Sequence, residues 1–253
     1  VNDLLYLETF KYTFPNLTTT GGFTALDLSQ NPSLTSVELK YTQIASLDLS
    51  ECPQLLTLKS ERSQITNVNL IGSQNIEHLG MSHCPIASLD ISNLPNLKTL
   101  SVPYTLLEEL STTNNPMLNN ISCTQSNLNT LDVSNSPLIT HIYCNNNNLT
   151  TLNVSNNPAL TALDCTYNQL TTLNLMNAGS SSMSVYASNN PLESLLLKNG
   201  HYDQIFINYI PNLSYICADE FEITSLQNTI SNNGYTTEIN TYCSFAPGGD
   251  FYT

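Results

Sequence analysis

The chain has 253 residues and a formal net charge of −14 at pH 7, with only 6 Lys and Arg residues. This balance argues against nucleic acid and against anionic membrane surfaces as ligands, because both are bound through clustered cationic side chains. Charged residues make up only 10% of the chain, so its solubility depends on uncharged polar groups, including 34 Asn residues. No apolar run approaches the roughly 20 residues of a membrane-spanning helix, so we expect no membrane insertion.

The first 15 residues do not share the repeating pattern that follows them. Apolar and polar residues alternate around Leu5, Leu7 and Phe10, which is typical of an edge strand. The end of a stacked structure exposes core side chains and unpaired backbone, and therefore needs a cover. We predict that residues 1–15 form an N-terminal cap.

Residues 16–218 repeat a unit of 21 residues, which is clearest in residues 131–175, where Cys144 and Cys165 are one period apart. A fixed period of this length indicates a solenoid, in which each coil buries its apolar side against the next coil. The unit fits the leucine-rich-repeat pattern L-x-x-L-x-L/C-x-x-N-x-L, here as Leu160-x-x-Leu163-x-Cys165-x-x-Asn168-x-Leu170.

Two columns of apolar pairs predict two extended segments in each coil. The main column contains Val37/Leu39, Leu58/Ser60, Leu79/Met81, Leu100/Val102, Ile121/Cys123, Ile142/Cys144, Leu163/Cys165 and Val185/Ala187. The second column runs from Leu26/Leu28 to Leu173/Leu175, after which the register slips by one residue. We predict a mostly β leucine-rich-repeat solenoid of about nine to ten 21-residue coils, with a parallel β-sheet, little helix and a cap at each end.

Polar columns mark the bends of each coil. Asn147, Asn168 and Asn190 recur at one bend, where their amides should bond otherwise unpaired backbone groups. Proline recurs at the opposite bend, where its missing N–H is tolerated, at positions 32, 53, 95, 116, 137, 158 and 191. A third column stands beside the second extended segment, and we expect it to form hydrogen bonds between coils: Asp27, Asp48, Asn69, Asp90, Asp132, Asn153 and Asn174.

Residues 219–253 leave the repeat and are predicted to form a C-terminal cap. Ile223, Leu226 and Ile230 are spaced three and four residues apart, which predicts one short helix. Gly234 should lie near its C-terminal end.

The seven cysteines fall into three groups. Cys217 and Cys243 flank the helical segment, and a disulfide between them would tie the cap to the last coil and imply an oxidising compartment. Cys52 and Cys84 occur at turn positions. The other three share the main column with Leu, Met and Val, so we expect buried small hydrophobes rather than metal ligands, although neighbouring thiols would be within disulfide reach: Cys123, Cys144 and Cys165.

The sequence indicates no catalytic or cofactor chemistry. Its four histidines, His78, His83, His141 and His201, show no spacing that suggests a Ser–His–Asp arrangement. The Asp/Asn column offers one oxygen-bearing group per coil, whereas calcium needs several that converge. We therefore expect neither enzyme activity nor a metal or other cofactor.

The outward positions of the main strands form the candidate ligand-binding face. Charges gather in the early coils, where Lys59 and Arg62 occur, and aromatic residues gather in the later ones. Exposed aromatic side chains on a rigid sheet give large contact area at small entropy cost, although they could also only cover the sheet and pack on one another. The aromatic candidates are Tyr104, Tyr143, Tyr167, Tyr186, Phe206 and Tyr209.

Residues 131–175 resemble the 21-residue, cysteine-containing repeats of internalin-J-like bacterial surface proteins. They resemble even more the Asn-rich repeats of secreted proteins from Bacteroidetes such as flavobacteria. The resemblance carries through Leu131-Asp-Val-Ser-Asn-Ser-Pro137 and Leu163-Asp-Cys-Thr-Tyr-Asn-Gln-Leu170. It implies a secreted or cell-surface protein, a chain that is a fragment of a longer one, and no catalytic residues.

Together, these observations favour a monomeric, non-enzymatic module that binds a protein through the concave face of its main strands, as in adhesion. Two alternatives stay open: a polysaccharide-binding module that uses the aromatic side chains, and a passive spacer in a larger secreted protein. Protein binding predicts that Lys59 and Arg62 contribute and that association depends on salt. Glycan binding predicts that only the aromatic side chains matter.

Overall fold

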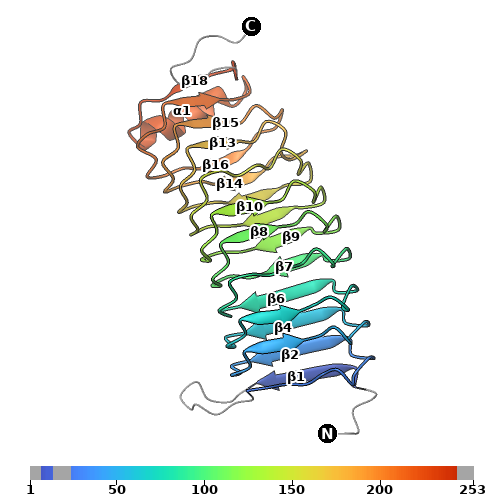
Figure 1. Cartoon of the computed structure of the whole chain (residues 1–253). Helices are drawn as coiled ribbons and strands as arrows, with labels where there is room; N and C mark the ends of the chain where they lie inside the picture. The colour runs from blue at the N-terminus through green and yellow to red at the C-terminus, as the bar shows by residue number, and fades with distance from the viewer. Residues whose placement is uncertain (1–6, 14–23, 244–253) are drawn as a thin grey trace.

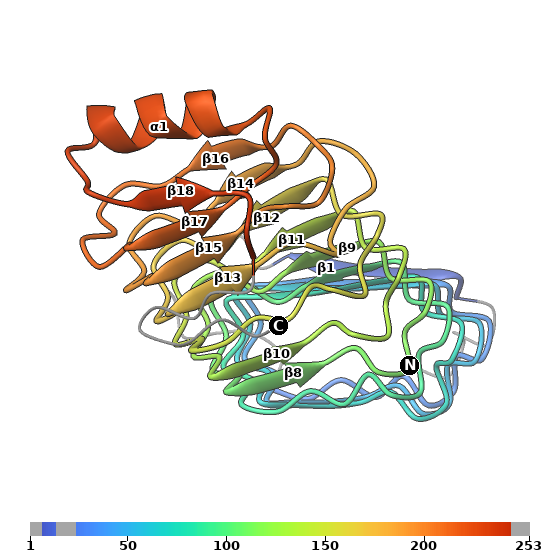
Figure 2. The ribbon, with the colours of Figure 1, turned by 90° about the horizontal axis from the view of Figure 1, so that it is seen from above.

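The computed structural model describes residues 7–13 and 24–243. The chain forms a mostly parallel β solenoid of about ten coils, stacked from the N-terminus to the C-terminus with the predicted period of about 21 residues (Figure 1). The view from above shows that successive coils are offset and rotated relative to one another (Figure 2).

One wall of the solenoid, the front sheet, is a continuous parallel sheet with one strand from each coil. Its strands, in spatial order, are β1 (Thr9–Thr13), β2 (Ser36–Lys40), β4 (Thr57–Glu61), β6 (His78–Ser82), β7 (Thr99–Ser101), β9 (Asn120–Ser122), β11 (His141–Tyr143), β12 (Ala162–Asp164), β14 (Ser184–Tyr186) and β16 (Gln204–Phe206). Paired residues are one repeat apart, so equivalent side chains form rows across the face.

The opposite wall, the back wall, is divided into shorter parallel sheets. These comprise β3 (Ser46–Asp48) with β5 (Asn67–Asn69), β8 (Glu109–Ser111) with β10 (Thr130–Asp132), and β13 (Thr172–Asn174), β15 (Ser194–Leu196), β17 (Tyr215–Cys217) and β18 (Glu238–Asn240). A single bridge joins Asn153 to Asn174. Because strand pairing in the back wall is interrupted, the front sheet is the longer continuous β-sheet surface of the stack.

The core is one cluster of inward side chains that runs along the stack. Residues alternate along each front strand, so Ile142 and Cys144 are fully buried while Tyr143 between them is exposed. Leu, Ile and Val from both walls fill the space between them, as both apolar columns predicted. The core therefore fixes the inward positions and leaves the outward positions of the front sheet free to vary.

Asparagine side chains close the bend after each later front strand. Asn168 donates from Nδ2 to the carbonyl oxygens of Cys144 and Cys165, each at 3.0 Å, and accepts at Oδ1 from the backbone N–H of Leu149 at 3.0 Å. Asn147 and Asn190 make the equivalent bonds. This confirms the predicted role of the column, which also joins each coil to the preceding one.

A second ladder runs along the bend before each front strand. Asn157 donates from Nδ2 to the carbonyl oxygens of Val133 and Ser136, each at 2.9 Å. Asn115 bonds the coil before it in the same way. Proline follows this position in most coils, but Pro191 follows Asn190 instead, so its predicted place at this bend is wrong. Pro191 lies 33 residues after Pro158 and therefore does not belong to the 21-residue proline column.

The two ends of the stack differ. β1 is the edge strand of the front sheet and pairs in parallel with β2, while residues 1–6, 14 and 15 of the predicted N-terminal cap lie outside the described residues. At the other end, the predicted short helix is present as α1 (Ile223–Asn232), which buries Leu226 and Ile230 beside β18 (Figure 2). Gly234, with a φ of +71°, follows the helix.

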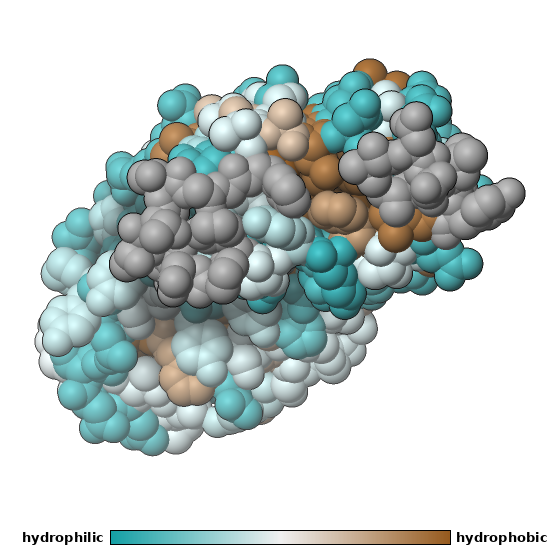
Figure 3. Space-filling model, turned by 90° about the horizontal axis from the view of Figure 1, so that it is seen from below, coloured by the Kyte–Doolittle hydropathy of each residue, from teal (hydrophilic) through white to brown (hydrophobic). Residues whose placement is uncertain are grey.

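The face of the molecule seen from below is mostly polar. In the view from below, most residues are pale or teal and apolar ones are confined to limited areas (Figure 3). Within residues 7–13 and 24–243, no helix is long and apolar enough to cross a membrane.

Truncation of a main-column leucine tests the inward assignment. Leu163 is fully buried in β12, so Leu163→Ala should lower the unfolding free energy by about 2–5 kcal/mol, through lost burial and the cavity left behind. The measurement is urea denaturation followed by circular dichroism. Thr151→Ala, at an exposed position, is the control and should change stability by less than about 0.5 kcal/mol. A similarly small effect for Leu163→Ala would contradict the assignment.

Candidate functional site

The middle residues of the front strands form a single outward row, the central row. It consists of Lys11, Glu38, Lys59, Gly80, Ser101, Ser122, Tyr143, Asp164, Tyr186 and Phe206. Neighbouring members are about 4.8 Å apart, the spacing between strands. The row changes from charged residues at one end to aromatic residues at the other.

Two aromatic side chains at the C-terminal end of this row are stacked. The rings of Tyr186 and Phe206 lie 4.5 Å apart between centroids, with an interplanar angle of 7°. Both side chains are about two-fifths exposed. Tyr143 lies two strands away, with Asp164 between. The sheet register therefore brings three of the predicted aromatic residues together.

The other predicted aromatic residues lie beyond the strands, at the corner where each coil turns away from the front sheet. In nine coils the corner residue has a φ between 50° and 57°, which defines the corner column: Tyr41, Arg62, His83, Tyr104, Gln125, Asn146, Tyr167, Asn189 and Tyr209. This left-handed conformation costs energy for residues other than glycine, and Asn tolerates it best. The turn lets the next residue, such as Asn168, point into the core and reach its carbonyl partners.

These corner side chains extend the aromatic region of the central row. Tyr167 is 57% exposed and Tyr209 is 76% exposed, and they belong to the coils of β12 and β16. We call Tyr143, Tyr167, Tyr186, Phe206 and Tyr209 together the aromatic surface. Tyr104 is separate from it and stacks on His83, with ring centroids 4.1 Å apart.

The early coils carry ion pairs on the same face. Lys40 pairs with Glu61 at 2.8 Å, and Lys11 pairs with Glu38 at 3.0 Å. These pairs are exposed, so each contributes little to stability. Lys59 and Arg62 lie in this region, about four strand spacings or roughly 19 Å from Tyr143, and therefore do not share one patch with the aromatic surface.

The three column cysteines are fully buried free thiols. Burial raises the pKa of Cys123 and of Cys165 to about 12, and raises that of Cys144 well above its usual value. Cys52 and Cys84 are also buried and free, and each occupies a bend position of one of the two polar ladders. Among the described residues, no group of three or more His, Cys, Asp and Glu side chains could hold a metal ion.

The Asp/Asn column forms hydrogen bonds within single coils as well as the predicted bonds between coils. Asp27, Asp48 and Asp90 each accept a hydrogen bond from the backbone N–H two residues further along their own coil. These bonds from Ser29, Ser50 and Ser92 lower the pKa of the three carboxyl groups. Bonds between coils are also present: the Asp132 carboxylate accepts from the hydroxyls of Ser111 at 3.5 Å and Thr113 at 3.4 Å in the preceding coil, as predicted.

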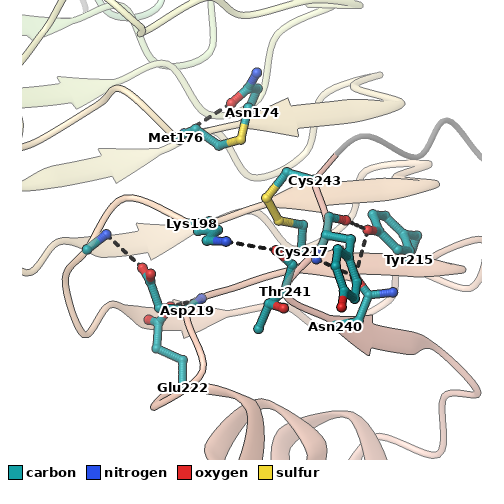
Figure 4. Close-up of a disulfide and its surroundings, with 12 residues drawn as sticks. Asn174, Met176, Lys198, Tyr215, Cys217, Asp219, Glu222, Asn240, Thr241 and Cys243 are labelled. Atoms are coloured by element: carbon teal, nitrogen blue, oxygen red, sulfur yellow. Dashed lines mark hydrogen bonds between the residues drawn. A yellow bond between two sulfur atoms is a disulfide. The ribbon is translucent and has the colours of Figure 1, made fainter. Parts of the chain in front are cut away.

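The structure joins Cys217 to Cys243 in a disulfide, which links β17 to the segment after β18 (Figure 4). Lys198 donates to the carbonyl oxygen of Thr241 at 2.9 Å on the same side of the chain. Nearby, Glu222 is almost fully buried and accepts from the backbone N–H of Asp203 at 2.9 Å. Burial raises the pKa of this carboxyl group. The disulfide and these hydrogen bonds hold the C-terminal segment against the last coils of the stack.

Coil length, the parallel front sheet and the polar ladders define the class: the chain has a leucine-rich-repeat solenoid fold. No protein-family model matches the sequence, and no curated protein matches it.

Solved structures share the fold at low sequence identity. The functional domain of InlJ from Listeria monocytogenes, which includes a cysteine ladder, is 22% identical with a TM-score of 0.69, over 82% of this chain and 45% of that one. The leucine-rich repeat domain of APL1B is 18% identical with a TM-score of 0.64, over 78% and 60%. TLR13, in complex with ssRNA13, is 17% identical with a TM-score of 0.55, over 75% and 29%. The chain thus spans less than two thirds of each.

The corner column can be tested at a tyrosine. Tyr167→Asn should raise the unfolding free energy by about 0.5–1 kcal/mol, because Asn accepts a φ of +54° with less strain. Urea denaturation gives the value, and Tyr143→Asn, in a strand, should bring no gain. A loss of more than about 1 kcal/mol at Tyr167 would mean that its ring supports the fold.

The buried thiols predict a labelling pattern. At pH 8, a thiol with a pKa of about 12 is a thiolate in only about one molecule in 10⁴, so the folded protein should resist iodoacetamide at Cys123 and Cys165. Unfolding in guanidinium should expose the five free cysteines, and reduction should add Cys217 and Cys243. Mass spectrometry counts the adducts. Rapid labelling of Cys123 in the native state would contradict its burial.

Proposed function

We propose that this chain is a non-enzymatic binding module of a secreted or cell-surface protein, and that its front sheet holds a protein partner. The observation that carries the proposal is the aromatic surface, where Tyr186 and Phe206 stack in the open on a rigid sheet. Tyrosine and other aromatic side chains are common anchors of protein interfaces, because each brings a large contact area at small entropy cost.

The corner column supports the same proposal. Asn would suit the backbone at these corners, as Asn146 and Asn189 illustrate, yet Tyr occupies the position in four of nine coils. Backbone strain that persists without a packing reason is typical of functional positions. Tyr167 and Tyr209 have mostly exposed side chains, so their rings serve contact with a ligand better than they serve the core.

A polysaccharide is the second candidate for the aromatic surface. Nearly coplanar rings such as Tyr186 and Phe206 offer apolar area on which a sugar could stack, and Asp164 beside them offers a carboxylate for hydroxyl groups. In that case Lys59 and Arg62, about 19 Å away, would not contribute. Nucleic acid is not favoured, because the net charge is −14.

A binding screen against surface proteins and polysaccharides tests the proposal. The double variant Tyr143→Ala/Tyr186→Ala should weaken binding of a protein ligand at least about tenfold, as for interface hot spots. Tyr202→Ala, which removes an exposed tyrosine before β16, is the matched control and should leave affinity unchanged.

The ligand panels separate the candidates. A protein ligand whose affinity also falls with added salt and with Lys59→Ala supports protein recognition. A polysaccharide ligand that depends only on the aromatic residues would replace the first candidate by the second. Binding that neither Tyr143→Ala/Tyr186→Ala nor Lys59→Ala changes would overturn the front sheet as the binding face, and no binding in either panel would favour a passive spacer.

A further inference from the structure

Gly80 interrupts the central row with a residue that has no side chain. Its neighbours in the row are Lys59 on β4 and Ser101 on β7. The backbone does not require glycine here, because the positive-φ glycines are Gly179, Gly200 and Gly234. A Cβ atom at Gly80 would meet its nearest neighbour, Cγ of Lys59, at 3.7 Å, an ordinary contact.

Gly72 shows the contrast. A Cβ atom there would lie 1.6 Å from the carbonyl oxygen of Ser50, so the fold excludes any larger residue at that position. Gly80 has neither a backbone conformation nor a close neighbour that requires glycine. What the missing side chain does is leave open space above the sheet at this position.

That space is an open hollow on the front sheet with a volume of about 470 Å³. Polar and charged side chains surround it: Glu38, Lys40, Lys59, Glu61, Ser82 and Ser101. The hollow is thus a polar depression in a face that otherwise carries side chains in every position of the central row.

One lysine at the hollow, Lys59, has no ion-pair partner among the described residues. Glu38 is paired with Lys11, and Glu61 with Lys40. Within residues 7–13 and 24–243, Lys59 forms no ion pair, and the Arg62 guanidinium donates to the hydroxyl of Tyr41 rather than to a carboxylate. The hollow is lined by two lysines and two glutamates, but Lys11 pairs with Glu38 from outside it, so Lys59 keeps a charge that no ion pair neutralises.

We infer that the hollow at Gly80 is a subsite for a carboxylate side chain of an acidic peptide segment. The Lys59 ammonium group would bind the carboxylate, and the Ser101 hydroxyl beside it would donate a hydrogen bond. Glu38 and Glu61 at the rim would repel a carboxylate, but each is paired with a lysine, which reduces that repulsion, whereas no carboxylate is paired with Lys59. The subsite lies about three strand spacings, or roughly 14 Å, from Tyr143, and does not depend on what the aromatic surface binds.

The probe is N-acetylated, C-amidated hexaglutamate, titrated into the ¹⁵N-labelled chain at low salt and followed by NMR, with hexaglutamine as the uncharged control. The amides of Lys59, Gly80 and Ser101 should shift with hexaglutamate only. Lys59→Ala should weaken binding about tenfold, as expected for a charged hydrogen bond. Gly80→Leu should abolish it by filling the hollow, while Gly80→Ala should leave the unfolding temperature unchanged.

Lys198→Ala is the matched control, because it removes the same charge at the far end of the stack and should have little effect. If Lys59→Ala and Lys198→Ala weaken hexaglutamate binding equally, the peptide is attracted by positive charge in general, and the proposed subsite is overturned. Binding that survives Gly80→Leu, or no shift with hexaglutamate, would also overturn it. If the chain binds polygalacturonate but does not bind hexaglutamate, the acidic-peptide proposal is overturned and the hollow is assigned to an acidic glycan.

Discussion

The solenoid depends on side chains that reach from one coil to the backbone of the preceding coil. At each bend, buried carbonyl oxygens would otherwise lack donors, which costs about 1–3 kcal/mol for each group. Asn147, Asn168 and Asn190 supply the donors at one bend, and Asn115 and Asn157 supply them at the other. Other coils use a hydroxyl at the same position, as Ser73 and Ser126 do. Because the donor must lie opposite the equivalent carbonyls of the preceding coil, the ladders hold the coil length near 21 residues and the strands in register.

The same requirement separates the residues that build the fold from those that can recognise a ligand. An amide such as Asn168 points inward only because the residue before it, Tyr167, turns the chain with a positive φ. The corner side chain then points away from the core. The corner column and the central row can therefore change from Lys and Arg to Tyr and Phe along the stack while the backbone stays constant.

Periodicity was sufficient to predict the coil, the inward columns and the Asn bends, because each depends on residues that repeat every 21 positions. Pro191 was misplaced because it lies 33 residues after Pro158, off the 21-residue period, and follows Asn190 at the other bend. The positive φ at the corners escaped prediction, although Asn146 and Asn189 carried a signal for it. The hollow at Gly80 could not be predicted, since only coordinates show that a Cβ atom would fit there.

The front sheet carries two chemically different regions at a separation that the strand spacing fixes. About 14 Å between Gly80 and Tyr143 corresponds to roughly four residues of extended chain. A ligand that contacts both regions needs to be no longer than a short segment, and after the first contact the second forms at a high effective concentration. With the two proposed roles, individually weak contacts, an exposed lysine in one region and stacked rings in the other, would together favour a ligand that presents an acidic group and an apolar group at that separation.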